Sequence, residues 1–407
     1  MGPRAVKVYV VGTCDTKGPE LAYACACVKE AGAEAVLIDV STVGTGPADV
    51  PAAQVAEHHP KGAAAVLGLK DRGQAISAMA EALGVFLATR KDIGAVLGLG
   101  GGGNTALVTE AMRSLPVGLP KLMLSTMASG QVAPYVGPTD IALMHSVADI
   151  AGLNAITRKV IANAAHAAAG MALNLKATQG ATLPALGFTM FGVTTPLVTQ
   201  LRQALEADHE CFVFHATGTG GQCFEKLADS GLFSGVFDVT TTEVADYLFG
   251  GVLPCTADRF GCFQRHAIPY VGSVGACDMV NFGPRETVPA RFSQRHFHVH
   301  NAQVTLMRTT PEENTAIGQF IVERLNRMAG PVRFLLPLKG VSALDAEGQA
   351  FHDPAADAAL FAAIRKGWNA DPRRKLLEID AHINEAAFAQ AALQAFREMR
   401  ESAHAPL

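Results

Sequence analysis

Two glycine-rich features of the sequence have residue types and spacing suited to holding an anion. Gly98, Gly100 and Gly103 satisfy the spacing G-x-G-x-x-G, and a run of four glycines leads into Asn104 and Thr105. Closely spaced glycines let backbone N–H groups approach an anion, and a helix that begins there adds the positive end of its dipole. The predicted anion site consists of Gly100, Gly101, Gly102, Gly103, Asn104 and Thr105.

The residues at the end of the strand that follows the glycine-rich run limit which classes of ligand the site can bind. A dinucleotide site needs an acidic residue there to bind a ribose, and the strand instead ends at Ser125 and Thr126. We therefore expect a phosphate or carboxylate ligand rather than a nicotinamide cofactor, or, alternatively, glycines that only permit a close strand–helix crossing. The loop that follows is small and polar, so Ser129 and Gly130 are added to the predicted binding residues.

The loop from Gly12 to Gly18 combines a lysine, a carboxylate and hydroxyls. Lys17 can neutralise phosphate charge, Asp15 can hold Mg²⁺ or a ribose hydroxyl, and Thr13 and Thr16 can donate to phosphate oxygens. The G-K-[ST] order of a Walker A loop is absent. The alternative is that Asp15 or Thr16 only caps the following helix.

Polar residues in apolar surroundings mark a second group of candidates. Asp278 and Asn281 lie in an apolar loop, and Arg308 ends a predicted strand, where it can clamp an anion. The loop 217–222 is a further, weaker anion site. His296, His298 and His300 alternate on one face of a strand, where they are more often ordinary polar residues than metal ligands.

The cysteines predict a reduced chain. There is no C-x-x-C pair, and most cysteines lie in apolar or glycine-rich surroundings, which favours free thiols over a disulfide framework. Cys14 lies in the first loop, so a reactive role for this thiol stays open. The eight are Cys14, Cys25, Cys27, Cys211, Cys223, Cys255, Cys262 and Cys277.

Alternating apolar runs and helical stretches predict the elements that carry these loops. Strands are expected at Lys7–Val11, Ala35–Val40, Ala95–Leu99, Lys121–Ser125, Ala185–Met190, Cys211–His215, Val236–Asp238, Tyr270–Gly272, His296–Asn301 and Val304–Arg308. Helices are expected at Glu20–Ala31, Asn104–Ser114 and Ala155–Lys176, and Thr310 begins a capping box. We predict an α/β protein of two doubly wound, Rossmann-like parallel-sheet domains, 1–180 and 181–407, with a ligand cleft between them.

Composition excludes several classes of function. The 407 residues include 33 basic and 37 acidic ones, a net charge of −4, so there is no basic excess for nucleic acid. The most apolar helical stretch, 160–175, is alanine-rich and too polar for a membrane span, and the start of the chain resembles no secretory signal. We expect a cytoplasmic protein that binds neither nucleic acid nor membrane.

Several long segments are familiar: GTCDTKGPEL, LGLGGGGNTAL, LSTMASGQVAPYVGPTDI, CDMVNFGP and HVHNAQVTLMRTT. With these, nearly the whole chain resembles the ATP-binding domain family of the tomato mosaic virus resistance protein. The resemblance implies a two-domain α/β protein that binds ATP with Mg²⁺ and forms a homodimer or a higher homo-oligomer. It places Thr13, Asp15, Thr16 and Lys17 in the family's first loop motif, and Gly100–Thr105 in its glycine-rich motif. The segment 254–264 departs from the family's usual small residues.

Two functional hypotheses follow. The first is an enzyme that uses ATP and Mg²⁺, with Asp15 as the candidate metal ligand, on a small carboxylic acid in the inter-domain cleft. Its candidate catalytic residues are Asp278, Asn281, His298, His300 and Arg308. The second is a non-catalytic, ATP-regulated binding module that acts on a protein partner. A second-half polar cluster that faces the nucleotide across one cleft favours the enzyme, and a cluster whose members are buried against one another favours the module. A histidine-centred metallohydrolase is a third possibility.

Overall fold

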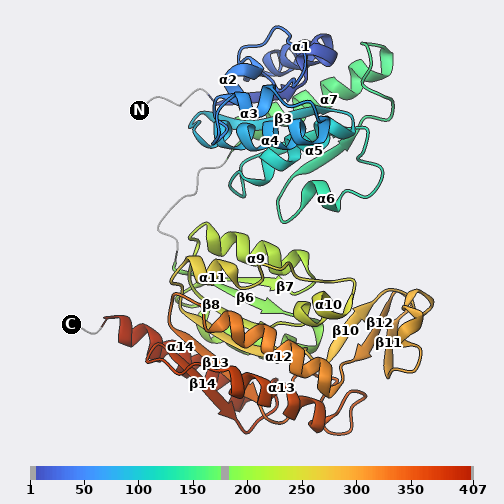
Figure 1. Ribbon diagram of the computed structural model, residues 1–407. Coiled ribbons are helices and arrows are strands. Elements are labelled where there is room, and N and C mark those ends of the chain that lie inside the picture. The colour runs from blue at the N-terminus through green and yellow to red at the C-terminus, as the bar shows by residue number, and fades with distance from the viewer. Residues whose placement is uncertain (1–5, 176–182, 405–407) are drawn as a thin grey trace. The chain divides into compact units, whose positions relative to one another are not determined.

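The computed structural model describes residues 6–175 and 183–404, in two compact units, Met1–Gln179 and Gly180–Leu407 (Figure 1). We call them the first and the second unit and describe each by itself. The loop expected between Thr178 and Pro184 lies mostly outside the described residues. The long helix expected to reach Lys176 ends at Leu173, where Asn174 is the C-cap.

The first unit is a five-stranded sheet whose strands all pair in parallel, in the order β2-β1-β3-β4-β5. Its strands are β1 (Lys7–Gly12), β2 (Glu34–Asp39), β3 (Ile93–Gly100), β4 (Lys121–Ser125) and β5 (Ala142–His145). Its helices are α1 (Cys14–Glu30), α2 (Ala52–Ala56), α3 (Ala64–Leu67), α4 (Arg72–Ala88), α5 (Gly102–Arg113), α6 (Ala133–Val136) and α7 (Ala155–Leu173). Separate hydrophobic clusters form on the two faces, one with α4 and α5 and the other with α1 and α7. Central strands are therefore almost continuously apolar.

The second unit repeats this design around six parallel strands, in the order β14-β13-β9-β8-β6-β7. They are β6 (Ala185–Met190), β7 (Glu210–His215), β8 (Phe233–Thr240), β9 (Tyr270–Gly275), β13 (Val332–Pro337) and β14 (Arg374–Ile379). An antiparallel sheet adds β10 (Met279–Phe282), β12 (Val304–Arg308) and β11 (Phe297–Asn301), in that order. The helices are α8 (Thr195–Leu205), α9 (Thr219–Asp229), α10 (Glu243–Phe249), α11 (Gly261–Arg265), α12 (Pro311–Leu325), α13 (Pro354–Gly367) and α14 (Ala386–His404).

Both sheets confirm the predicted doubly wound α/β class, and the capping box of Thr310 and Glu313 at α12 is present. Within each sheet, the chain turns one way after the first strand and the other way after the third. Loops that leave neighbouring strands toward opposite faces open a crevice at the carboxyl ends, where such sheets bind ligands. In the first unit this position lies between β1 and β3, and in the second between β6 and β8.

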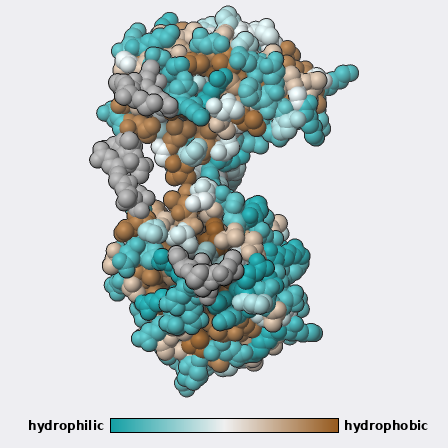
Figure 2. All heavy atoms as spheres, turned by 90° about the vertical axis from the view of Figure 1, so that its left-hand side faces the viewer, coloured by the Kyte–Doolittle hydropathy of each residue, from teal (hydrophilic) through white to brown (hydrophobic). Residues whose placement is uncertain are grey.

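The surface is mainly hydrophilic on the face that Figure 2 displays, with hydrophobic residues scattered among the polar ones. Scattered apolar residues are normal on a folded surface. Within residues 6–175 and 183–404, no helix combines the length and the apolar character that crossing a membrane requires.

Candidate functional site

The two loops singled out in the first half line one pocket of about 600 Å³ at the β1–β3 position of the first unit. The first loop contributes Thr13, Asp15, Thr16 and Lys17, and the glycine-rich loop contributes Gly101, Gly102, Gly103 and Asn104. Ser129 and Gly130 are exposed in the turn after β4 and do not line this pocket. The strand order explains the meeting, because β1 and β3 are hydrogen-bonded neighbours although 80 residues of sequence separate their loops.

The glycine-rich loop exposes backbone donors to this pocket. β3 ends at Gly100, whose φ of 155° suits glycine, and α5 begins immediately after Gly101. The N–H groups of the first turn, Gly102, Gly103 and Asn104, have no carbonyl acceptor within the helix, as at every helix start. The loop therefore presents several donors and the positive end of a helix dipole, an arrangement that binds anions.

Asn104 adds an acceptor. Its Nδ2 donates to the carbonyl of Leu99, while its buried Oδ1 has no hydrogen-bond partner among the described residues. A buried acceptor without a partner costs free energy, so a hydroxyl or amino group of a ligand would be favoured there. Thr105, by contrast, is fully buried and donates to Gly101 O at 2.9 Å, which makes it a positioning residue rather than a ligand contact.

The first loop is held from β2 by a residue that the sequence did not single out. The buried Asp39 accepts from the N–H groups of Cys14 (3.0 Å) and Ser41 (2.9 Å), and Ser41 Oγ accepts from Asp15 N–H at 3.2 Å. Thr13 is the N-cap of α1, and no side chain caps it, so Asp15 and Thr16 are not capping residues. Asp15 Oδ2 accepts from Gly44 N–H at 3.2 Å, and Oδ1 has no partner among the residues that the structure describes.

The side chain of Lys17 has one hydrogen-bond partner within the described part of the chain. Its Nζ donates to the carbonyl oxygen of Ile150, and its backbone departs from helical angles, with φ −128° and ψ 21°. Because an ammonium carries three donors, this contact fixes the side chain at the pocket and leaves two donors for a ligand.

Two more cations line the pocket: Lys70, just before α4, and Arg72, the first residue of α4. Arg72 Nη2 lies 3.6 Å from the position that a Cβ on Gly103 would take, so the guanidinium is directly beside the glycine-rich turn. Sequence reasoning missed both, because neither lies in a glycine-rich or strand-end motif. Two carboxylates, Asp15 and Asp149, also line the pocket and are oxygen ligands of the kind that Mg²⁺ prefers.

Cys14 is not a reactive thiol. Its side chain is buried, and burial, followed by the nearby charge of Asp39, raises its pKa to about 12. Because the thiolate is the nucleophile, a thiol that stays protonated is inert at neutral pH. All eight cysteines are free, as the prediction of reduced thiols requires.

The weaker anion loop of the second unit, 217–222, already holds an anion from the chain itself. Glu243 is fully buried at the start of α10, and its Oε1 accepts from the N–H groups of Gly218 (2.6 Å) and Gly221 (3.1 Å). A Cβ on Gly221 would lie 2.0 Å from Glu243 Oε2, so only glycine permits this approach. The donors that would hold a ligand phosphate are therefore taken by an internal carboxylate.

Arg259 balances this carboxylate within a buried network. Its Nη2 lies 2.7 Å from Asp238 Oδ1, its Nη1 lies 3.2 Å from Glu225 Oε1, and its Nε lies 3.4 Å from Glu243 Oε2. One cation thus faces three carboxylates away from water, and burial raises the pKa of Glu243 to about 7. The segment 254–264, which differs from the small residues usual in the family, therefore contributes a structural arginine to the core.

Arg308 and Asp278, two of the predicted second-half candidates, have hydrogen-bond partners within the chain, although Asp278 Oδ1 has none among the described residues. Arg308, 6% exposed, donates through Nε to Phe351 O (2.8 Å) and through Nη2 to Asp357 Oδ1 (2.9 Å) and Asp345 Oδ1 (3.2 Å). Asp278 is fully buried, accepts from Ser342 Oγ at 2.8 Å, and has its pKa raised by burial to about 6. The members of this cluster are buried against one another, so Arg308 is a structural cation rather than a residue that clamps an anionic ligand.

Asn281 and the histidines lie elsewhere. Asn281 is 1% exposed and binds Asp246 Oδ1 through its backbone N–H (2.7 Å) and its Nδ2 (3.1 Å). His298 and His300 lie on the edge strand β11 with ring centroids 6.3 Å apart, and the pairing of β11 with β12 shifts register between Val299 and Asn301. In the described ranges, these histidines belong to no group of three metal-ligand side chains.

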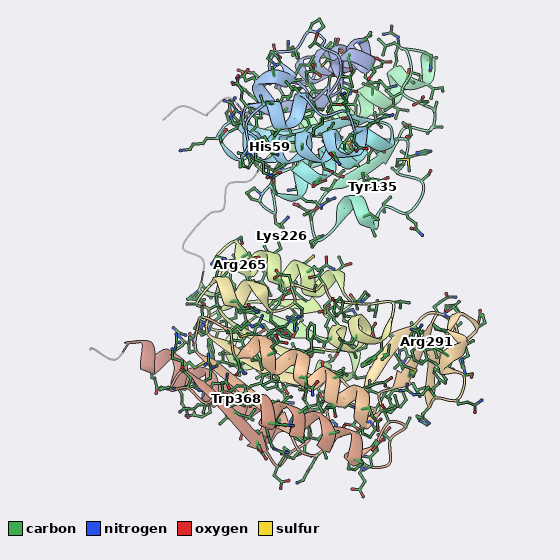
Figure 3. The ribbon with its side chains drawn as sticks, in the orientation of Figure 1. His59, Tyr135, Lys226, Arg265, Arg291 and Trp368 are labelled. Atoms are coloured by element: carbon green, nitrogen blue, oxygen red, sulfur yellow. The ribbon has the colours of Figure 1, made fainter. Side chains whose placement is uncertain are left out.

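The buried carboxyls predict an unusual pH dependence for the second unit. Burial raises the pKa of Glu243 and that of Asp246 to about 7, above the values near 4 of an unfolded chain. Between about pH 4.5 and 7 the native state then holds protons that the unfolded state has released, so stability falls as pH rises. We expect a gain of roughly 1–3 kcal/mol on going from pH 7.5 to pH 5.5. Urea unfolding followed by the fluorescence of Trp368, the single tryptophan, reports this unit (Figure 3); a midpoint that falls on acidification would contradict the expectation.

Models of an uncharacterised protein family, UPF0261, match both units: its N-terminal domain matches residues 6–177 and its C-terminal domain matches residues 183–400. A protein of this family from Rhizobium meliloti (strain 1021) is 57% identical over 97% of this chain and 99% of that protein. The ToMV resistance protein Tm-1(GCR237) of Solanum lycopersicum is 42% identical over 97% of this chain and 56% of that protein. The chain therefore spans little more than half of the tomato relative.

A comparison with solved structures adds a C2-type ketoreductase from a modular polyketide synthase, which covers 98% of this chain at 16% identity with a TM-score of 0.22. A TM-score this low does not show a common fold, so the architecture rests on the strand pairing described above. Because the family is described as uncharacterised, the chemistry has to be argued from the residues of the pocket.

Proposed function

The chain belongs to the UPF0261 family, and from the residues of its own pocket we propose that it binds ATP with Mg²⁺ in the first unit. The observation that carries the proposal is the convergence of the first turn of α5 with Lys17, Lys70 and Arg72 on one pocket. Backbone donors, a helix dipole and cationic side chains together favour a polyphosphate over a singly charged ligand.

The same pocket has groups for the metal and for the rest of the nucleotide. Asp15 and Asp149 offer carboxylate oxygens, and Mg²⁺ bound to a nucleotide uses one or two such ligands besides phosphate and water. The unpartnered Asn104 Oδ1 would accept from a ribose hydroxyl or from an amino group. Ile76 and Leu107 add apolar lining suited to a base.

What the bound nucleotide does is the second part of the proposal. An ATP-using enzyme would need groups that reach a small carboxylic acid, and Asp278 and Arg308 are buried and contact other groups of the chain. This burial favours the second candidate, an ATP-regulated binding module that acts on a protein partner. Release of ADP or AMP from Mg–ATP, with and without small carboxylic acids, separates the two. The proposal also includes a cytoplasmic location and a homodimer. Light scattering of the purified protein tests the homodimer.

Replacing Arg72 or Lys17 by alanine is expected to weaken Mg–ATP binding. Arg72 is exposed and lies beside Gly103, so Arg72→Ala removes a positive charge from the pocket with little effect on the fold. Lys17→Ala removes a second positive charge. Each should raise the Kd by about tenfold or more, because a charge-assisted hydrogen bond contributes roughly 1.5–3 kcal/mol. Calorimetry measures the change. Lys29→Ala, an exposed lysine at the other end of α1, is the matched control. Equal affinities of all three variants and the native protein would remove this pocket as the nucleotide site.

A further inference from the structure

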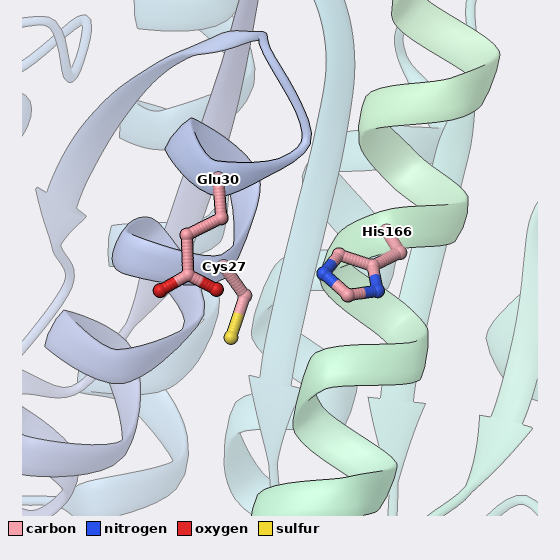
Figure 4. A group of neighbouring side chains, drawn as sticks. All are labelled: Cys27, Glu30 and His166. Atoms are coloured by element: carbon pink, nitrogen blue, oxygen red, sulfur yellow. The ribbon is translucent and has the colours of Figure 1, made fainter.

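The first unit contains a second cluster of ligand-type side chains away from the pocket, Cys27, Glu30 and His166. Among the residues that the structure describes, these three bring a thiol sulfur, a carboxylate oxygen and an imidazole nitrogen within 4.8 Å of one another. Figure 4 shows Cys27 and Glu30 on one helix and His166 facing them from the other. Sulfur, nitrogen and oxygen ligands in this combination are those of zinc sites.

Two helices that are already fixed to each other supply the three side chains. Cys27 and Glu30 are three residues apart on α1 and so share a face, and His166 is on α7. Nearer the start of α1, Glu20 Oε1 accepts from Gly152 N–H at 2.5 Å, and Arg158 lies 5.1 Å over the ring of Tyr23. The backbone positions of the three ligands are therefore set by contacts that do not involve a metal.

The burial of the three side chains fits an ion entering from solvent. Cys27 is 2% exposed, while Glu30 and His166 are exposed above it. Zinc–ligand bonds of 2.0–2.3 Å place tetrahedral ligand atoms about 3.5 Å apart, so donors that lie within 4.8 Å of one another need to approach by at most about 1.3 Å. The exposed Glu30 and His166 side chains can make this adjustment by rotation, and water completes the fourth position.

We propose that Cys27, Glu30 and His166 bind one Zn²⁺ ion that clamps α1 to α7. Binding forms a bond from the Cys27 sulfur to zinc and releases the thiol proton to solvent, so that affinity rises with pH. The ion would hold the helix whose first turn carries Asp15, Thr16 and Lys17. The clamp does not depend on the nucleotide proposal, because no residue is shared by the two sites.

Titration of the metal-free full-length protein with Zn²⁺, and with Co²⁺ as a spectroscopic probe, tests the proposal. One equivalent of Co²⁺ should give intense tetrahedral d–d bands and a thiolate-to-cobalt charge-transfer band, both displaced by Zn²⁺. Cys27→Ser should abolish the charge-transfer band, and His166→Ala should weaken Zn²⁺ binding by at least the ~10–100-fold that loss of an outer partner already costs. Cys25→Ser removes another buried cysteine of α1 that is not part of the three-ligand group, and should leave the titration unchanged.

Two results would overturn the proposal. One is a native protein that binds neither ion with a stoichiometry of one and shows no thiolate band. The other is a thiolate band that persists in Cys27→Ser or disappears equally in Cys25→Ser, which would assign the metal to a different cysteine. Circular dichroism of each variant separates loss of a ligand from loss of the fold.

Discussion

Replacing Gly103 by aspartate is expected to abolish Mg–ATP binding while the first unit stays folded. A Cβ at Gly103 would lie 3.4 Å from Ile76 Cδ1 and 3.6 Å from Arg72 Nη2, so the position has room for a side chain. The new carboxylate would take the place of a ligand phosphate and pair with Arg72. Two like charges about 4 Å apart repel by roughly 4 kcal/mol at the effective dielectric of a protein surface, so the Kd should rise at least about a hundredfold.

Gly103→Asp should weaken Mg–ATP binding but stabilise the fold of the first unit, and this combination makes the prediction specific. Gly103 lies in the first turn of α5, where an acidic side chain interacts favourably with the helix dipole and aspartate replaces a flexible glycine. Gly103→Asn adds almost the same volume without charge, so the difference between the two variants isolates the electrostatic effect. Calorimetric titration and thermal unfolding measure both quantities. Undiminished Mg–ATP affinity in Gly103→Asp would rule out phosphate binding at this turn.

Replacing Arg259 by methionine is expected to destabilise the second unit by about 3–5 kcal/mol, because it leaves buried carboxylates without a counter-charge. Arg259 is 1% exposed and lies within ion-pair distance of Asp238, Glu225 and Glu243. The loss should shrink as pH falls through about 7, where protonation neutralises Glu243, whose pKa burial raises to about 7, and a packing defect would not depend on pH in this way.

Arg265→Met in the neighbouring helix α11 is the matched control. Arg265 also pairs with an acid, Asp229, at 2.8 Å, but its side chain is 47% exposed (Figure 3), so its loss should cost about 1 kcal/mol at most. Urea unfolding read from Trp368, which lies 6.5 Å from Phe334 between ring centroids, follows this unit in both variants. Equal shifts for Arg259→Met and Arg265→Met would show that the buried network contributes no more than a surface pair.

Local patterns in the sequence determined the strands and the loops that could bind an anion. The expected strands Lys121–Ser125, Ala185–Met190 and Val304–Arg308 match β4, β6 and β12 residue for residue, because each is a short apolar run bounded by turn residues. β5 was not predicted, since the four residues of this edge strand are exposed or only partly buried and show no alternating pattern. The glycine-rich run was recognisable because only a few backbone conformations need so many glycines.

Only the tertiary structure decided which charged groups each glycine-rich loop faces. Lys70 and Arg72 come from a segment with no motif, and the β2-β1-β3 strand order brings them to the pocket. Tertiary contacts also distinguish two similar glycine-rich loops. Gly101–Asn104 lines an open pocket, while the N–H groups of Gly218 and Gly221 bind Glu243 at the start of α10. Local sequence sets backbone conformation through contacts between near neighbours. The partner of a charged or polar group depends on contacts between residues far apart in the chain, and these exist only once the sheet has formed.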